Sequence, residues 1–224
     1  MGTRLSVAVG MMLLVLSSAT NVFAQLYGEG VEIYKERSGV SVVYDGGINI
    51  SVEGEGITSL LLTHPKLGAP VTILQNTAGF DEIEFDRGEE WTAFTKLIPN
   101  GSYQLTIKLG ALTVNHPFVV DYSLMPAVPT ITSPTDGQVL PEPSLVVTWN
   151  SPPPGVDAIY VSVESDNGGC DFESGYLPPG STYYIVPSSI LEPGRSYGVD
   201  VEFTRGGNGV LYFSDHEVEF SIAP

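Results

Sequence analysis

The residues that could perform nucleophilic catalysis stand in the wrong local context. Gly194-Arg195-Ser196-Tyr197-Gly198 matches the G-x-S-x-G pattern of serine hydrolases. That pattern needs a strand before the serine and a helix after it, so that the hydroxyl is exposed on a strained turn. Here a turn signal precedes the serine and a strand-like segment, VDVEF, follows it. We therefore expect no catalytic site, and a protein that is not an enzyme.

Two acidic segments have the residue types that bind calcium, which takes several carboxylate and carbonyl oxygens as ligands. In residues 80–90 the alternation predicts a strand with Ile83 and Phe85 facing inward, and this arrangement disperses the carboxylates on the outer face. Residues 164–173 predict a glycine-containing loop, for which a solvated loop remains the alternative. No cofactor is predicted, and the weak calcium candidates are Asp166, Asn167, Asp171 and Glu173.

Histidine and tyrosine side chains provide the other candidate chemistry. His64, His116 and His216 are far apart in the sequence and lack the spacing of a metal site, so we expect surface histidines beside turns. The second half has several tyrosines that could stack on sugar rings or anchor a protein partner, although some of them are expected in the core. These tyrosines are Tyr176, Tyr183, Tyr184 and Tyr212.

Composition excludes several classes of protein. The chain has 224 residues, of which 26 are acidic and 9 basic, and a net charge of −17. This charge argues against a nucleic-acid-binding protein, whose phosphate contacts need a basic surface. An apolar content of 42% excludes a mainly disordered chain. Cys170 is the only cysteine, which excludes a disulfide scaffold and a cysteine-based zinc site.

Residues 1–24 have the layout of a secretory signal peptide. Arg4 precedes an apolar run from Leu5 to Leu16, and a polar stretch leads to Ala24 at a small-residue cleavage site. The apolar run is shorter than the roughly 20 residues that span a bilayer. We therefore expect a secreted or periplasmic protein, with no membrane span in the mature chain.

Strands with one buried face are the dominant pattern after the signal peptide. Apolar residues alternate with polar ones in residues 103–109, 145–149, 159–163 and 197–203. Gly- and Pro-rich turn signals separate these segments, as they do in sandwiches and barrels. No segment after residue 25 shows a convincing helical period. The sequence therefore predicts an all-β fold of antiparallel sheets.

The chain divides into two similar halves. Two prolines in residues 125–129 predict an extended linker. We therefore expect sandwiches at 25–125 and 130–224, joined by a linker at 126–129. Each half contains the same order of Leu, Pro, Gly, Ser and Tyr before an alternating strand, which is typical of a tandem repeat. The matched residues are Leu97, Pro99 and Tyr103 in the first half and Leu191, Pro193 and Tyr197 in the second.

The second half resembles a fibronectin type III domain, an immunoglobulin-like β-sandwich. Residues 129–134 resemble its proline-rich start, Trp149 its strand B tryptophan, and residues 191–197 the corner before its sixth strand. The resemblance implies that the tyrosine ring is buried while its hydroxyl bonds back to the nearby backbone. The first half shares only this corner. The family's Arg-Gly-Asp tripeptide is absent, so the resemblance implies no binding residues.

Together these observations predict an exported, non-enzymatic β-sandwich protein. It would act as a structural spacer or a protein-binding module outside the cytoplasm, with a protein or cell-envelope partner. The alternative is a calcium-dependent or carbohydrate-binding adhesion domain.

Overall fold

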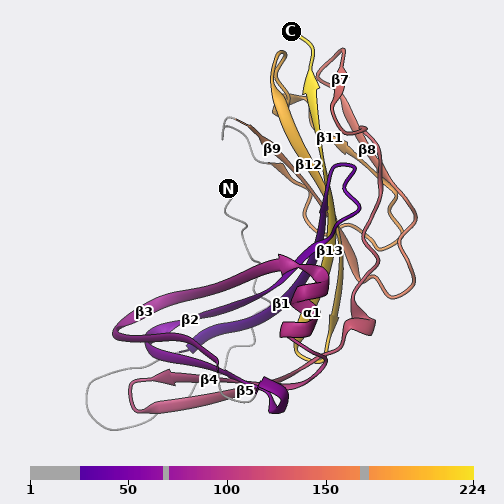
Figure 1. Ribbon diagram of the computed structural model, residues 1–224. Helices are drawn as coiled ribbons and strands as arrows, with labels where there is room; N and C mark the ends of the chain where they lie inside the picture. Colours follow the sequence, from indigo (N-terminus) through magenta and orange to yellow (C-terminus); the bar gives the residue numbers. More distant parts are fainter. Residues whose placement is uncertain (1–25, 68–70, 167–171) are drawn as a thin grey trace.

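The computed structural model describes residues 26–67, 71–166 and 172–224, so the predicted signal peptide lies outside it. The predicted all-β, sandwich-like class is confirmed (Figure 1). The strands are β1 Leu26–Ser38, β2 Asp45–Thr63, β3 Val71–Glu90, β4 Gly101–Leu109, β5 Leu112–Val120, β6 Ile131–Ser133, β7 Gln138–Leu140, β8 Leu145–Trp149, β9 Ala158–Ser165, β10 Phe172–Glu173, β11 Tyr183–Val186, β12 Ser196–Gly207 and β13 Val210–Ile222.

The second half is a sandwich of two facing sheets. One sheet has the order β11-β8-β6, and the facing sheet has the order β10-β9-β12-β13, with β7 pairing to β13. Alternate residues of both sheets point into a shared apolar core, as the period-two pattern predicts. The three-strand and four-strand layers, joined in this order, are the arrangement of a fibronectin type III-like fold.

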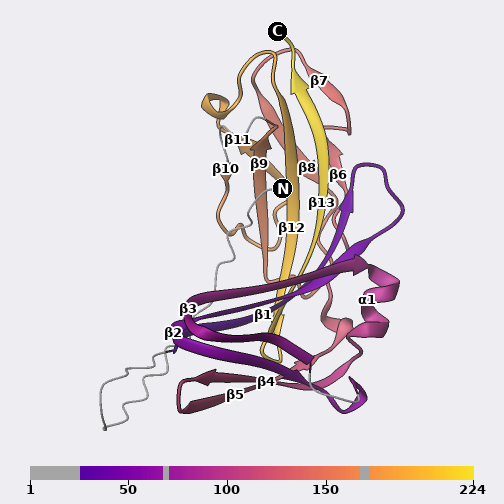
Figure 2. The ribbon, with the colours of Figure 1, turned by 60° about the vertical axis from the view of Figure 1, so that its left-hand side comes forward.

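The first half is one bent sheet folded over its own core. The long strand β2 pairs with β1, β3 and β4, and register shifts interrupt its ladder with β3 between Glu53 and Ile57. Such shifts bend a strand and increase its twist. Figure 2 shows β4 and β5 lying beneath β1 to β3 as a result. The apolar side chains of β1, β2, β4 and β5 meet between these two layers.

A parallel strand pair joins the two halves into one sheet. Residues Glu32–Ser38 of β1 lie beside Leu211–Glu217 of β13, which extends the sheet of the second half into the first. Figure 1 shows the β12–β13 hairpin passing from one half into the other. Val210 and Tyr212, near the tip, are buried in the core of the first half. This parallel pair, and that of β7 with β13, are exceptions to the antiparallel pairing that the sequence predicts.

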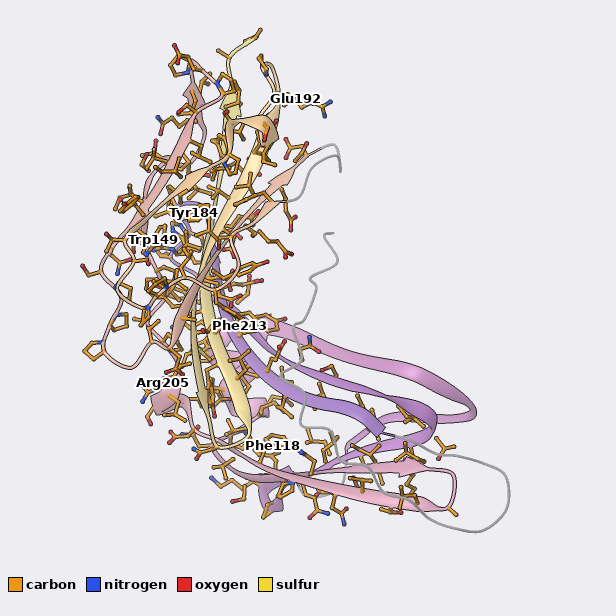
Figure 3. All side chains as sticks on the ribbon, turned by 180° about the vertical axis from the view of Figure 1, so that it is seen from behind. Phe118, Trp149, Tyr184, Glu192, Arg205 and Phe213 are labelled. Carbon is orange, nitrogen blue, oxygen red and sulfur yellow. The ribbon has the colours of Figure 1, made fainter. Side chains whose placement is uncertain are left out.

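The tip of this hairpin also contacts β5. The carbonyl of Asn208 accepts a hydrogen bond of 3.1 Å from the Val119 amide. Phe118, buried next to it, lies at this end of the molecule in Figure 3. Two residues that connect β12 to β13 therefore lie against the first half, although they are about 90 positions away from it in the sequence.

The proline segment between the halves is docked rather than solvated. Pro126 and Pro129 are buried. The Ser214 hydroxyl donates to the Ala127 carbonyl at 3.2 Å, and the Arg37 Nη2 donates to the Pro129 carbonyl at 3.2 Å. These bonds hold the segment against β13 and β1. The domain boundaries at 125 and 130 stay a prediction.

A short helix corrects the expectation that no helix follows residue 25. α1 spans Trp91–Leu97, and its Phe94 is fully buried in the core of the first half. Trp91, Phe94 and Ile98 follow the i, i+3, i+7 spacing of one helical face. Two turns of helix are too short for this spacing to stand out in the sequence. No helix in the described residues is long and apolar enough to cross a membrane.

Candidate functional site

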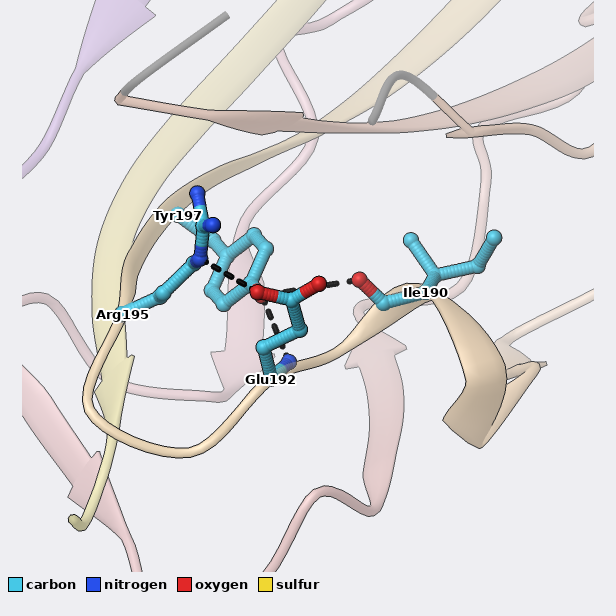
Figure 4. Close-up of polar contacts among 4 residues, drawn as sticks. All are labelled: Ile190, Glu192, Arg195 and Tyr197. Atoms are coloured by element: carbon cyan, nitrogen blue, oxygen red, sulfur yellow. Dashed lines mark hydrogen bonds and ion pairs between the residues drawn. The ribbon is translucent and has the colours of Figure 1, made fainter. Parts of the chain in front are cut away.

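The corner before β12 is held by the Tyr197 hydroxyl (Figure 4). The ring is 1% exposed, and its hydroxyl accepts a hydrogen bond from the Glu192 amide at 2.7 Å. The same hydroxyl donates to the Ile190 carbonyl at 3.5 Å. An ion pair of 2.5 Å between Arg195 and Glu192 closes the turn on its outer side. Leu191 is buried beside this corner, whereas Pro193 is exposed in the turn.

The first half has an equivalent corner at Tyr103. The ring is buried between His64 and Phe118, with centroid separations of 4.2 and 5.3 Å. Its hydroxyl donates to the Pro99 carbonyl at 2.7 Å, and burial raises the pKa of Tyr103. Leu97 packs against the same core. In both corners a buried tyrosine ring lies beneath a turn, and the tyrosine hydroxyl forms a hydrogen bond to the backbone of that turn.

Trp149 ends β8 inside the second core. It is 4% exposed, and its indole N–H donates to the Ser181 carbonyl at 2.9 Å. This bond satisfies the buried donor and ties the end of β8 to the segment that leads into β11. Figure 3 shows Trp149 and Tyr184 in the same part of this sandwich.

Ser196 lies in a local structure unlike that of a hydrolase nucleophile. It is exposed at the first residue of β12, directly before Tyr197, and a strand rather than a helix follows it. Its partner in the ladder is Ser221 of β13. A nucleophile elbow needs strand, turn and helix in that order. The G-x-S-x-G pattern here instead covers the turn and the first residues of β12 that form the tyrosine corner.

The calcium candidates are only partly within the described residues. Asp166 and Glu173 are exposed on either side of the loop, whereas Asn167 and Asp171 lie outside the described residues, as does Cys170. The backbone of residues 81–90 is part of β3, but the side chains of 81–89 also lie outside. Among the side chains that are described, no group of three or more His, Cys, Asp or Glu residues could hold a metal ion.

His216 corrects the expectation of three surface histidines. It is 4% exposed on β13, and its Nδ1 accepts a hydrogen bond of 3.0 Å from the Ile131 amide. Its Nε2 lies 2.8 Å from the Gly39 carbonyl, which can only accept, so Nε2 carries the proton. Burial lowers the pKa of His216, and Arg37 lowers it further. The neutral ring therefore links β13, the β1–β2 turn and the start of the second half.

The other two histidines are far from His216 along the fold. His64 precedes the short 3-10 helix Pro65–Leu67, where its Nδ1 accepts a hydrogen bond of 3.1 Å from the Lys66 amide. Burial lowers the pKa of His64, and Lys66 adds to this effect. His116 lies on β5, and its ring centroid is 6.3 Å from that of Phe118. The structure assigns these rings to packing and turn formation.

The four tyrosines of the second half do not form one cluster. Tyr212 is fully buried in the core of the first half, where its hydroxyl accepts from the Asp121 amide at 2.8 Å and donates to the Val119 carbonyl at 3.1 Å. Tyr184 packs against the second core, with Phe172 at a centroid distance of 5.7 Å. Tyr176 and Tyr183 are exposed. Only these last two are available to a ligand.

The two sheets of the second sandwich differ sharply in charge. The β9-β12-β13 sheet carries carboxylates on the face that points away from the core, and β1 extends this acidic face with Glu32 and Glu36. Tyr176 lies near this face, with its ring centroid 6.2 Å from that of Tyr160 on β9. Burial raises the pKa of Tyr176, and Glu202 and Glu32 raise it further. The exposed or half-buried carboxylates of the acidic face within the second half are Glu164, Asp200, Glu202, Glu217 and Glu219, whereas Asp215 on the same face is buried.

The opposite sheet is free of charge. β6, β8 and β11 contain no acidic or basic residue. On its outer side Val146 and Ile185 are direct partners across the ladder and are 43% and 64% exposed, and Tyr183 is 60% exposed. The sequence already contains a pattern from which this neutral face could have been predicted. Residues 174–191 include no charged residue, in a chain of net charge −17.

The comparisons with known proteins identify no family and no curated relative. No family model matches the chain, and no curated protein matches it. A two-domain fibronectin type III segment of chicken tenascin is 15% identical, covers 76% of this chain and 89% of its own, and has a TM-score of 0.29. The FN1–FN3 domains of chicken CNTN1 are 11% identical, cover 87% and 69%, and have a TM-score of 0.34.

The order of strands in the second half is that of a fibronectin type III-like fold. The fold hosts many activities, so the function has to be argued from the surfaces and the junction described above.

Proposed function

We propose that this chain is an exported, non-enzymatic module that acts as a spacer and binds a protein partner outside the cytoplasm. The observation that supports the spacer role is the parallel ladder between β1 and β13. A hinge between the halves would break this ladder and withdraw Val210 and Tyr212 from the first core. Two sandwiches on a flexible linker would have no such restraint.

The surface charge supports a protein partner rather than an anionic one. The acidic face of the β9-β12-β13 sheet repels nucleic acids and anionic lipid surfaces and attracts cationic proteins over the range of the Debye length. The partner that we propose is therefore a cell-envelope protein with a basic surface.

The spacer role is tested by the spread of distances between the halves. We would place spin labels at Lys108→Cys and Ser189→Cys, both exposed, in a Cys170→Ser background. A rigid spacer predicts one narrow distance distribution by pulsed electron resonance. The matched control carries both labels in the second half, at Glu142→Cys and Ser189→Cys. A distribution much broader than that of the control would disprove the spacer.

The partner and the absence of catalysis need a separate experiment. Tagged mature protein would be incubated with cell-envelope extract of its own organism, and the captured proteins would be identified. The capture would be repeated in about 0.5 M salt, which screens electrostatic attraction between surfaces. We expect a captured protein that is released by salt. A turnover activity that a single substitution abolishes would contradict the non-enzymatic part of the proposal.

A further inference from the structure

The strand β11 has an unpaired edge within the described part of the chain. It is the outermost strand of its sheet, and its ladder with β8 runs from Tyr183 to Val186. The Trp149 amide donates to the Thr182 carbonyl at 3.1 Å, which makes these two residues a hydrogen-bonded pair. Such pairs alternate along an antiparallel ladder, so Tyr184 is the next residue that bonds to β8. Tyr183 and Ile185 therefore direct their N–H and C=O groups to the open edge.

This edge lacks most of the devices by which proteins protect edge strands. Natural edges carry charged side chains, proline or a bulge that prevents pairing with another chain. β11 has none of these within its four residues, and its only such protection is its short length. The side chains of Tyr183 and Ile185 stand exposed on the outer side, at 60% and 64%. Both the backbone and the side chains of these two residues are thus accessible.

The absence of charge makes this edge compatible with a second copy of the chain. A second copy of this chain, at net charge −17, is repelled wherever two acidic faces approach. The segment 174–191 and the neighbouring strand β8 contain no charged residue, so pairing of β11 with β11 places no like charges within the paired strands themselves. The contact between the two strands is therefore electrostatically neutral.

The register of β11 is complementary to itself. If two copies are related by a two-fold axis at Tyr184, Tyr183 of one copy lies opposite Ile185 of the partner subunit, and the reverse pair forms on the other side of the axis. Both residues of each pair have outward-directed N–H and C=O groups, so they bond to each other as an antiparallel ladder requires. Each pair also places an aromatic side chain beside a β-branched one, a favourable cross-strand combination.

We propose that two copies of this chain associate through β11, antiparallel and centred on Tyr184, so that the two three-stranded sheets become one of six strands. This is an isologous contact, which closes at the dimer. The inference goes beyond the proposed function and does not depend on it, because a spacer can act as a monomer or as a pair.

The first experiment measures association by sedimentation equilibrium of the mature protein at concentrations up to about 1 mM, which covers weak dimers. We expect a reversible monomer–dimer equilibrium. Ile185→Lys places a charge at the edge and should weaken the dimer by about tenfold or more. Val139→Lys is the matched control, because Val139 is 62% exposed on β7, and it should leave the dimer unchanged. Circular dichroism verifies that both variants are folded.

The second experiment tests the register. In a Cys170→Ser background, the double variant Tyr183→Cys and Ile185→Cys should form a disulfide-linked dimer under mild oxidation, because hydrogen-bonded partners have Cα atoms about 5.5 Å apart. Either single variant should cross-link far less, since each cysteine then faces the wrong residue of the partner. A monomeric wild-type protein at all concentrations would overturn the proposal. An equal effect of Ile185→Lys and Val139→Lys, or equal cross-linking by the single variants, would overturn it as well.

Discussion

At the scale of single residues, buried hydroxyls and one buried imidazole hold loops against both cores. The Tyr103 hydroxyl bonds to Pro99, and that of Tyr197 bonds to the Glu192 amide, so each ring ties a turn to the strand that follows. His216 does the same for the junction through Ile131 and Gly39. Local spacing was enough to predict both tyrosine corners. It carried no information on His216, whose two partners are 85 and 177 residues away.

The tyrosine corners predict a specific loss of stability. Tyr197→Phe leaves the Glu192 amide without its acceptor, and Tyr103→Phe removes the donor to Pro99. Each substitution should lower the free energy of unfolding by about 1 kcal/mol, the net value of one hydrogen bond. Urea denaturation gives this value. Tyr183→Phe, at an exposed ring, is the control, and an effect of Tyr197→Phe no larger than this control would contradict the corner.

The buried His216 predicts that stability falls in mild acid. The pKa of His216 is lower in the folded protein than the value of about 6.5 expected in the unfolded chain. At a pH between the folded and unfolded pKa, the unfolded chain therefore binds a proton that the folded protein does not bind. The free energy of unfolding should therefore decrease as the pH falls below about 6.5, by at most about 1.4 kcal/mol per pH unit. His64 contributes in the same direction.

The measurement compares urea unfolding of the wild-type protein and His216→Gln between pH 7.5 and 5. Glutamine has an acceptor and a donor for Ile131 and Gly39 but does not titrate in this range. We expect the variant to have a flatter pH dependence than the wild type, with the part due to His64 remaining. Parallel curves for the two proteins would show that His216 does not bear this linkage.

At the scale of elements, alternation predicted most strands, and packing decided the rest. α1 was not predicted, because its seven residues are stabilised by tertiary contacts more than by their own period. Trp91 starts this helix and lies against Gly46 of β2, where a Cβ atom would overlap the indole ring. The ammonium group of Lys35 lies 5.2 Å from the centroid of the Trp91 ring on the same side of the sheet. These contacts depend on a glycine that is 45 residues away from the helix in sequence.

Gly46→Ala should therefore destabilise the first half. The new methyl group would overlap Trp91 and lie 2.8 Å from the Tyr34 carbonyl oxygen, which is backbone and cannot move aside easily. Overpacking of this kind costs roughly 1 to 3 kcal/mol. Thermal unfolding and the near-ultraviolet signal of tryptophan report the change. Gly180→Ala is the control, because a Cβ at Gly180 has no atom within 4 Å, and equal melting temperatures for the two variants would contradict this packing.

At the scale of the whole molecule, the two halves depend unequally on each other. All buried residues of the second core lie between Ile131 and Ile222, whereas the first core includes Val210 and Tyr212 from β13. The second half thus contains its complete core. The first half depends on β13 of the second half for two core side chains and for the strand that pairs with β1.

Fragments of the chain should show this asymmetry. We expect residues 126–224 to fold alone, and residues 26–125 to lack cooperative unfolding and dispersed amide resonances, because they lack Val210, Tyr212 and β13. In residues 26–224 the first half should unfold cooperatively, because β13 and its two core side chains are present. Calorimetry and amide spectra of the three proteins test this. A cooperative transition in the fragment 26–125 would contradict the dependence.

Sequence alone determined the all-β class, the alternation within most strands and the turns with their tyrosine corners. These features follow from interactions within a few residues, where the two-residue period of a strand and the conformations of Gly and Pro leave their pattern directly in the chain. The tertiary structure decided that β1 pairs with β13, that Tyr212 is buried in the first core and that His216 lies at the junction. Strand alternation says which face of a strand is apolar but not which strand lies beside it, so these pairings depend on contacts between distant segments.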